Sequence, residues 1–321
     1  ISVLNWGLGH VTRSIPIITA LHEKNNQLFI FCNESQKLIF SQYMNDVHYV
    51  YHPGYPFKFK GKGRFRVNFF NQIKGLAGVF RTIPEVVKDF DDLGIPPVLK
   101  NLALMDRGLV LLTGPTGSGK STTLAAMVDH INIQRKCHII TIEDPVEFIH
   151  KDKKSIVSQR EVGKQTESFA HALKAALRED PDVILVGELR DLETIGMALT
   201  AAETGHLVFG TLHTSGAPNT VNRIIDVFPP EQQGQIRAQL AESLNMVVTQ
   251  KLFKKKDGSG RVGAFEVMVC NAPIKNLIRE AKIHQIPSVM QTAQREGMIT
   301  MEKSIEDLIG RGDISNAEKN S

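Results

Sequence analysis

A glycine-rich stretch, GPTGSGKS at residues 114–121, has the residue types and spacing to bind a nucleoside triphosphate. It lies between an apolar segment and a helical one, which is the context this motif requires. Its glycines let backbone N–H groups surround phosphate oxygens at a helix N-terminus, where the helix dipole favours negative charge. Lys120 is then placed to reach the β- and γ-phosphates, and Ser121 to ligate Mg²⁺. The residues predicted to bind the nucleotide here are Gly114, Pro115, Thr116, Gly117, Ser118, Gly119, Lys120, Ser121 and Thr122. The alternative, a glycine turn that binds nothing, is disfavoured by the complete pattern and its context.

Carboxylates follow two other apolar segments. IITIEDPVEF places Glu143, and after it Asp144 and Glu147, beyond one segment, and VILVGE places Glu188 at the end of another. Neighbouring parallel strands end at one edge of a sheet, so these groups are predicted to meet the phosphates and to position the attacking water. Either carboxylate alone is equally well explained as a solvated or helix-capping group. The occurrence of both beside a phosphate-binding loop favours catalysis.

Two histidines bracket a further apolar segment in ETGHLVFGTLHT. His206 and His213 are seven residues apart, one before and one after the segment. A single histidine is more often structural than functional. Because both flank a strand next to the predicted nucleotide, we expect both to lie at the nucleotide site.

The elements that must position these residues alternate between strand and helix. Short apolar segments separated by helical ones predict a mostly parallel sheet with helices on its faces, an α/β fold. Asp191 is a predicted N-cap and Gly205 the end of the same helix. After Pro230 the chain is expected to be mainly helical with one more strand. The predicted strands are residues 108–113, 138–142, 182–187, 206–212 and 261–269.

Composition is that of an ordinary folded protein. The 321 residues suffice for two domains, and 42% hydrophobic with 22% charged residues excludes a disordered chain. Basic residues exceed acidic ones by only four, a surplus too small to argue for nucleic-acid binding, and no nucleic-acid partner is expected. The three cysteines lie far apart, and no apolar run is long enough to span a bilayer. We therefore expect a cytoplasmic protein that does not insert into membranes.

The region before the phosphate-binding loop contains a predicted β-ribbon. Residues 64–82 read as two strands around a glycine-containing turn, followed by a proline-flanked linker. Arg66 and Arg81 each fall on one of these strands. They are either surface arginines or cations that act on bound nucleotide. The basic, glycine-rich residues 58–64 are predicted to mark a boundary.

In their order, these motifs resemble the secretion and pilus motor ATPases, most closely the PilT type, from about Arg64 onward. The resemblance implies a RecA-like P-loop ATPase that uses ATP and Mg²⁺. It implies that Glu188 is the catalytic glutamate, that Glu143 belongs to the acidic box and that His213 contacts the γ-phosphate. Gly187 replaces the usual aspartate, as it does throughout this family, so that Mg²⁺ rests on Ser121, waters and the acidic box that contains Glu143. Arginines matching Arg66 and Arg81 act like arginine fingers in this family.

The direction of action implied by the resemblance is pilus retraction. APIKNLIRE at residues 272–280 resembles the AIRNLIRE segment of retraction motors, with Pro273 and Lys275 as departures. The four-cysteine zinc insertion usual in extension and secretion ATPases is absent from the sequence. A homohexamer acting on the inner-membrane platform protein of a type IV pilus is implied. The alternatives are a pilus-extension or type II secretion ATPase, and a subunit that binds nucleotide with little turnover.

Residues 1–61 do not resemble this family. Gly7, Gly9 and His10 form a turn similar to the first turn of GT-B glycosyltransferases, although an ordinary βα turn explains it equally well. A helix and a strand at 27–31 are expected to follow. We predict three parts: a foreign-looking segment at 1–61, a remnant of a PAS-like domain with ribbon and linker at 62–97, and the motor domain with its helical C-terminal region at 98–321. Because the sequence begins without Met, we expect it to be a fragment or a trimmed reading frame.

Overall fold

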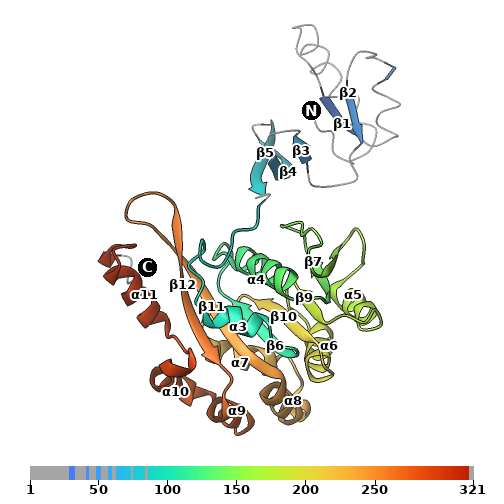
Figure 1. The fold of residues 1–321 in the computed structure, drawn as a ribbon. Coiled ribbons are helices and arrows are strands. Elements are labelled where there is room, and N and C mark those ends of the chain that lie inside the picture. The colour runs from blue at the N-terminus through green and yellow to red at the C-terminus, as the bar shows by residue number, and fades with distance from the viewer. Residues whose placement is uncertain are drawn as a thin grey trace. The chain divides into compact units, whose positions relative to one another are not determined.

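The structure is a computed structural model. It describes residues 29–32, 41–42, 48–51, 57–59, 63–73, 75–83 and 86–317. The chain divides into two compact units, residues 1–85 and 86–321 (Figure 1). The glycine turn predicted at residues 7–10 and the helix after it lie outside the described residues.

The first unit contains two small sheets. One is a parallel pair, and the other is an antiparallel sheet of three strands in the order β3-β4-β5. The strand predicted at 27–31 overlaps β1, and the predicted ribbon is confirmed as β4 and β5. Lys58 and Arg64 are register partners between β3 and β4, so the ends of the predicted boundary stretch pair as strands. The strands are β1 (Phe29–Cys32), β2 (His48–Tyr51), β3 (Phe57–Phe59), β4 (Gly63–Gln72) and β5 (Gly75–Ile83).

The second unit is built on a seven-stranded sheet in the order β12-β11-β6-β10-β9-β7-β8. Every neighbouring pair is parallel except β11 and β12. This topology confirms the predicted mostly parallel sheet. The strands are β6 (Gly108–Thr113), β7 (His138–Glu143), β8 (Ile156–Glu161), β9 (Val183–Val186), β10 (Leu207–Leu212), β11 (Leu244–Lys254) and β12 (Arg261–Val269).

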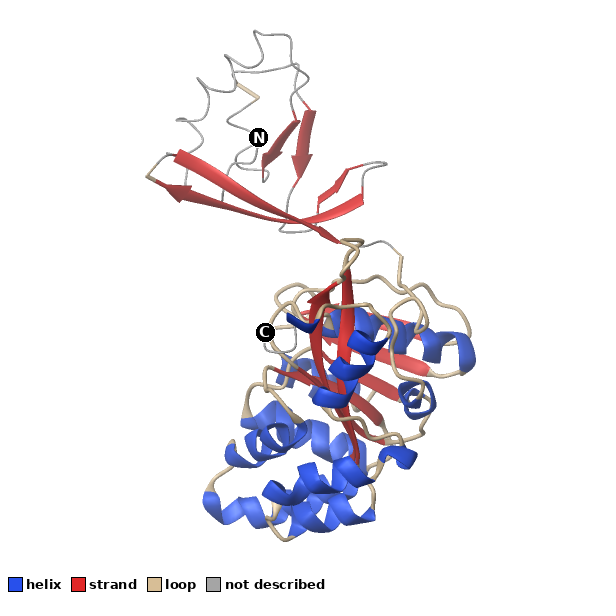
Figure 2. Cartoon of the chain, turned by 90° about the vertical axis from the view of Figure 1, so that its left-hand side faces the viewer, coloured by secondary structure: helices blue, strands red, loops and turns tan. Residues whose placement is uncertain are grey.

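Helices cover both faces of this sheet (Figure 2). Asp191 caps α6 as predicted, because its carboxylate accepts hydrogen bonds from the Thr194 backbone N–H and hydroxyl, each at 2.8 Å. Gly205 follows the end of this helix with φ at 111°. The helices are α3 (Val98–Ala103), α4 (Lys120–Gln134), α5 (Phe169–Ala176), α6 (Leu192–Glu203), α7 (Ala217–Asp226), α8 (Pro230–Ser243), α9 (Ala272–Arg279), α10 (Ile286–Thr292) and α11 (Met301–Gly310).

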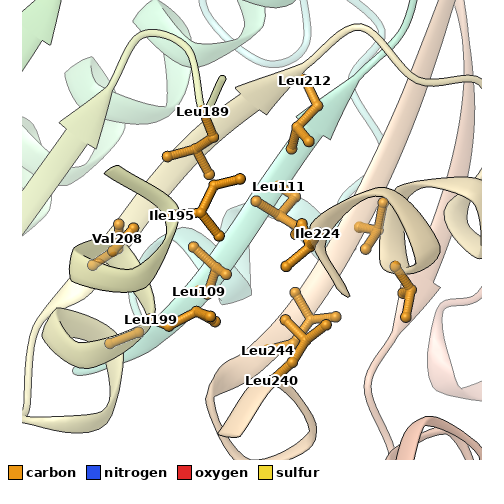
Figure 3. Close-up of a cluster of buried hydrophobic side chains, with 14 of the residues drawn as sticks. Leu109, Leu111, Leu189, Ile195, Leu199, Val208, Leu212, Ile224, Leu240 and Leu244 are labelled. Carbon is orange, nitrogen blue, oxygen red and sulfur yellow. The ribbon is translucent and has the colours of Figure 1, made fainter. Parts of the chain in front are cut away.

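The central strand β6 divides the core between the two faces. Leu109 and Leu111 pack into a cluster with residues of α6, α7 and α8 (Figure 3). Val110 and Leu112 point the other way, into a cluster with α3 and α4. All four side chains are at most 1% exposed, and a fully buried Leu or Val contributes roughly 1.5–3 kcal/mol. Burial on both faces fixes β6 at the centre and, with it, the loop that follows.

Strands β8 and β11 were not predicted. The region after Pro230 is mainly helical as expected, but the expectation of a single strand there is wrong, because β11 occupies Leu244–Lys254 in addition to β12. Helix α8 ends at Ser243 and β11 begins at the next residue, so no Gly or Pro marks the change. Strand β8 is an edge strand of mixed polarity, which gives a weak periodic signal.

Candidate nucleotide-binding site

The phosphate-binding loop at residues 114–119 connects β6 to α4. Gly114 has φ at 135°, and a Cβ there would lie 2.3 Å from the Gln250 carbonyl oxygen. At Gly119, the N-cap of α4, φ is 92° and a Cβ would lie 2.8 Å from Gln250 Nε2. The backbone conformation disfavours a side chain at both positions, and at Gly114 the backbone carbonyl of Gln250 also leaves no room for one.

Polar side chains of strand β11 contact the residues on both sides of this loop. The buried Gln250 accepts a hydrogen bond from Thr123 Oγ1 of α4 at 2.9 Å. The hydroxyls of Thr113 and Thr249 are 3.0 Å apart, which joins β11 to the residue before Gly114. Sequence reasoning missed these residues. The available signal was the polar pair at 249–250 inside the apolar run LNMVVTQKLF.

Lys120 is buried within the loop and faces into it. Its ammonium donates to the carbonyl oxygens of Gly114 at 2.7 Å and Pro115 at 3.1 Å. Burial lowers its pKa, and the nearby Glu188 carboxylate acts in the opposite direction. The buried Ser118 hydroxyl has no hydrogen-bond partner within the described part of the chain. A desolvated cation and an unpaired donor in one loop suit an anionic ligand.

Glu188, Arg190 and His213 form a cluster where β9 and β10 end. Glu188 Oε2 accepts a hydrogen bond from Arg190 Nη2 at 2.6 Å, and its Oε1 lies 3.5 Å from His213 Nε2. The hydrogen bond from Arg190 is the main cause of a lowered pKa at Glu188. The structure thus brings Glu188 and His213 together and places Lys120 near Glu188, while their roles at the nucleotide stay predictions. Arg190 was missed, although it lies only two residues beyond Glu188.

Glu143 ends β7 at the same edge of the sheet. Its Oε1 accepts hydrogen bonds from Thr141 Oγ1 at 2.7 Å and Gln159 Nε2 at 3.2 Å. Burial raises its pKa, and these hydrogen bonds act in the opposite direction. A Cβ at Gly187 would lie 3.2 Å from the Glu143 Cα and 3.1 Å from the Ile142 carbonyl oxygen. This close approach of the two strand ends explains a glycine where other P-loop proteins carry aspartate.

The donors predicted to hold Mg²⁺ have suitable chemistry. Ser121 offers an exposed hydroxyl in the first turn of α4, and Glu143 offers a carboxylate. Hard oxygen ligands suit Mg²⁺, which uses one or two protein groups together with waters and substrate phosphates. Among the residues that the structure describes, no three His, Cys, Asp or Glu side chains form a metal-binding group. The metal role of Ser121 and Glu143 stays a prediction.

One predicted site residue of the second unit, His206, does not lie at this edge. His206 precedes β10, and its Nδ1 lies 3.0 Å from the Ala201 carbonyl oxygen. A six-residue strand separates it from His213, about 20 Å at roughly 3.3 Å per residue. Residues that bracket a strand lie at opposite edges of the sheet, a point the prediction overlooked. Arg66 and Arg81 are register partners across β4 and β5 in the first unit, and their nucleotide role stays a prediction.

A buried central strand, a glycine loop and a helix, with carboxylates at the same sheet edge, define a P-loop nucleotide-binding protein. Residues 58–320 match the family model "Type II/IV secretion system protein", and the chain belongs to that family. A "Twitching motility protein" of Neisseria gonorrhoeae is 51% identical over 302 residues, which cover 94% of this chain and 79% of that protein.

Two further relatives agree. The type IV pilus retraction ATPase PilT of Pseudomonas aeruginosa is 51% identical over 288 residues, 90% of this chain and 81% of that protein. A crystal structure of the pilus retraction motor PilT with bound ADP has a TM-score of 0.76 at 51% identity, covering 83% of this chain and 75% of that one. These matches confirm the resemblance and the RecA-like fold.

The same comparisons bear on residues 1–61. The match to the gonococcal protein covers 302 of the 321 residues, so it includes more than half of this segment. The alignment with that relative therefore extends into this segment. The similarity of its glycine turn to a glycosyltransferase, and the boundaries at 61 and 97, stay predictions.

Proposed function

We propose that this chain is the subunit of an ATP-hydrolysing motor that powers retraction of a type IV pilus. The observation that carries the ATPase is the meeting of Lys120, Glu188 and His213 at one edge of the sheet. The retraction role is supported by the sequence identity between this chain and proteins named for twitching motility and pilus retraction.

The chemistry follows from the charges at this edge. Lys120 binds the β- and γ-phosphates, and in doing so exchanges its carbonyl contacts for phosphate oxygens. Ser121, with Glu143 nearby, would hold Mg²⁺, which would supply positive charge to neutralise the phosphates. Glu188 is kept ionised by Arg190, so it can orient the attacking water and accept its proton. His213, beside Glu188, contacts the γ-phosphate.

In this proposal the chain assembles into a homohexamer, and closure of its subunits on ATP does the mechanical work. Arg66 and Arg81 are register partners on β4 and β5, and we assign them to stabilise charge on the transferred phosphoryl group when subunits close. The partner is the inner-membrane platform protein of the pilus, so the motor works in the cytoplasm at that membrane. Within the described residues, no helix has the length and apolar character of a membrane span.

The second candidate is a pilus-extension or type II secretion ATPase. The segment that distinguishes a retraction motor from this second candidate is α9, whose sequence is similar to that of retraction motors. Ile274 and Ile278 of this helix are fully buried, so they are needed for packing under either function. Asn276 is exposed, and in the described part of the chain its amide donates only to Glu280 of the same helix, at 3.0 Å. Substitution of Asn276 therefore tests whether α9 couples ATP turnover to pilus retraction, without disturbing the hydrophobic core.

The experiment is twitching motility in a retraction-deficient host. The chain is expected to restore motility, and Asn276→Ala to abolish it while ATP turnover of the purified variant stays within about twofold of the unmodified chain. The lost helix contact is worth only about 0.2–0.5 kcal/mol, so the fold is retained. Ser288→Ala, at an exposed position of α10, is the matched control and should keep motility. Failure of the unmodified chain to restore motility would favour the extension or secretion role.

A further inference from the structure

The carboxylate of Glu266 contacts the start of two helices. Glu266 lies on β12 and is partly buried. Its Oε1 accepts the backbone N–H of Ala217, the first residue of α7, at 2.8 Å. The N-cap residue of α7 is Gly216, which has no side chain to accept hydrogen bonds from the first N–H groups of the helix. A residue about fifty positions away in the sequence therefore caps this helix.

The second helix is α11, near the C-terminal end of the chain. Burial raises the pKa of Glu266, and the backbone N–H of Met301, the first residue of α11, acts in the opposite direction because it faces the same carboxylate. Next to it, Val267 and Ile299 exchange backbone hydrogen bonds of 2.7 and 2.9 Å, which hold the segment before α11 against β12. A carboxylate is favoured at both positions, because the N-termini of helices carry partial positive charge.

The contacts of Glu266 lead to the nucleotide site by two routes. The first runs through α7, because only three residues separate its first residue from His213. Thr220 stiffens this turn: its hydroxyl lies 2.7 Å from Thr214 Oγ1 and donates to the Gly216 carbonyl oxygen at 2.8 Å. The turn that carries His213 is thus fixed to the end of α7 that Glu266 caps.

The second route runs through β11. Thr249 Oγ1 lies 3.4 Å from Glu266 Oε1 and 3.0 Å from Thr113 Oγ1. Thr113 is the last residue of β6, directly before Gly114. The Glu266 carboxylate therefore contacts the start of α7, which follows His213, directly. Through the hydroxyl of Thr249 it reaches Thr113, the residue before the phosphate-binding loop. It also faces the start of α11.

We propose that Glu266 is a positioning residue that ties the N-terminus of α7 to that of α11 and thereby holds His213 in place at the nucleotide. The proposal rests on the ATPase function proposed above. It assigns to Glu266 no contact with nucleotide. Its removal should therefore slow the chemical step and leave nucleotide affinity unchanged.

The test compares Glu266→Ala, Glu266→Asp and Glu266→Gln in the full chain. Aspartate keeps the charge but is one carbon shorter, so it cannot reach both amides, whereas glutamine keeps the length and an acceptor oxygen. Glu302→Ala is the matched control, because Glu302 is an exposed carboxylate in the first turn of α11. Amide hydrogen exchange without nucleotide, ADP affinity and kcat for ATP are measured for each.

For Glu266→Ala and Glu266→Asp we expect amide exchange to rise about tenfold at the starts of both α7 and α11. We expect kcat to fall at least about fivefold, ADP affinity to stay within about twofold, and Glu266→Gln to recover most of kcat. If Glu266→Ala fails to fold, Glu266→Asp decides. A kcat equal to that of the Glu302→Ala control, or faster exchange at only one helix, overturns the proposal. If the unmodified chain has no ATPase activity, the proposed function is wrong. The amide exchange data then still show whether Glu266 holds the starts of both α7 and α11.

Discussion

Replacement of Gly114 by alanine tests how β11 supports the phosphate-binding loop. The new Cβ would lie 2.3 Å from the Gln250 carbonyl oxygen and 2.9 Å from Ser118 Oγ. The carbonyl belongs to a strand paired on both sides, so it cannot move aside easily. Gly117→Ala is the matched control, because Gly117 also has positive φ, 81°, but no atom lies within 4 Å of its Cβ position.

The two variants separate backbone strain from the clash. A non-glycine residue at such a φ costs roughly 1–2 kcal/mol, which both variants share. Overpacking adds roughly 1–3 kcal/mol at Gly114 alone. We therefore expect the free energy of unfolding to fall by about 1–2 kcal/mol for Gly117→Ala and about 2–5 kcal/mol for Gly114→Ala.

Urea unfolding followed by circular dichroism measures both values, and ADP affinity shows whether the loop has shifted instead. If Gly114→Ala is no less stable than Gly117→Ala and binds ADP equally well, the reasoning about β11 is refuted.

Three further predictions concern the nucleotide site and the first unit. Arg190→Ala should raise the pKa of Glu188, since the hydrogen bond that lowers it is lost; a larger share of Glu188 is then protonated at acidic pH, and the acid limb of the kcat profile moves to higher pH. An unchanged profile in a pH titration of kcat would contradict this. Arg66→Ala and Arg81→Ala should each lower kcat with little change in nucleotide affinity, since an arginine finger contributes roughly 10³–10⁵ to rate; weaker binding at unchanged kcat would exclude that role. Deletion of residues 1–61 should leave turnover per subunit within about twofold, roughly 0.4 kcal/mol in barrier height, and the chain should transfer no sugar from any nucleotide donor. A tenfold loss of turnover, or sugar transfer, would show that the segment was misread.

Features that depend on local pattern could be predicted from the sequence. Strand β6 is a short apolar run that ends at glycines, and both its burial and the conformation of Gly114 follow from that pattern. The capping of α6 by Asp191 is equally local. Glu188 and His213 were placed correctly because the ends of neighbouring parallel strands must meet.

Features that depend on long-range pairing could not be predicted. Gln250 lies beneath the phosphate-binding loop only because β11 pairs with β6, more than a hundred residues away in sequence. His206 was assigned to the site from its closeness in sequence to His213, whereas the strand between them carries it to the opposite edge. Arg190 and Glu266 act through contacts that neither spacing nor periodicity encodes.

ATP turnover by the purified chain is the most direct test of the motor ATPase. The chain should hydrolyse ATP in the presence of Mg²⁺. Glu188→Gln should still bind ATP but lose turnover by roughly 10²-fold or more, because no carboxylate remains to orient the water. Lys120→Ala should lose turnover and also bind ATP more weakly. Hydrolysis by Glu188→Gln at the rate of the unmodified chain would contradict the account.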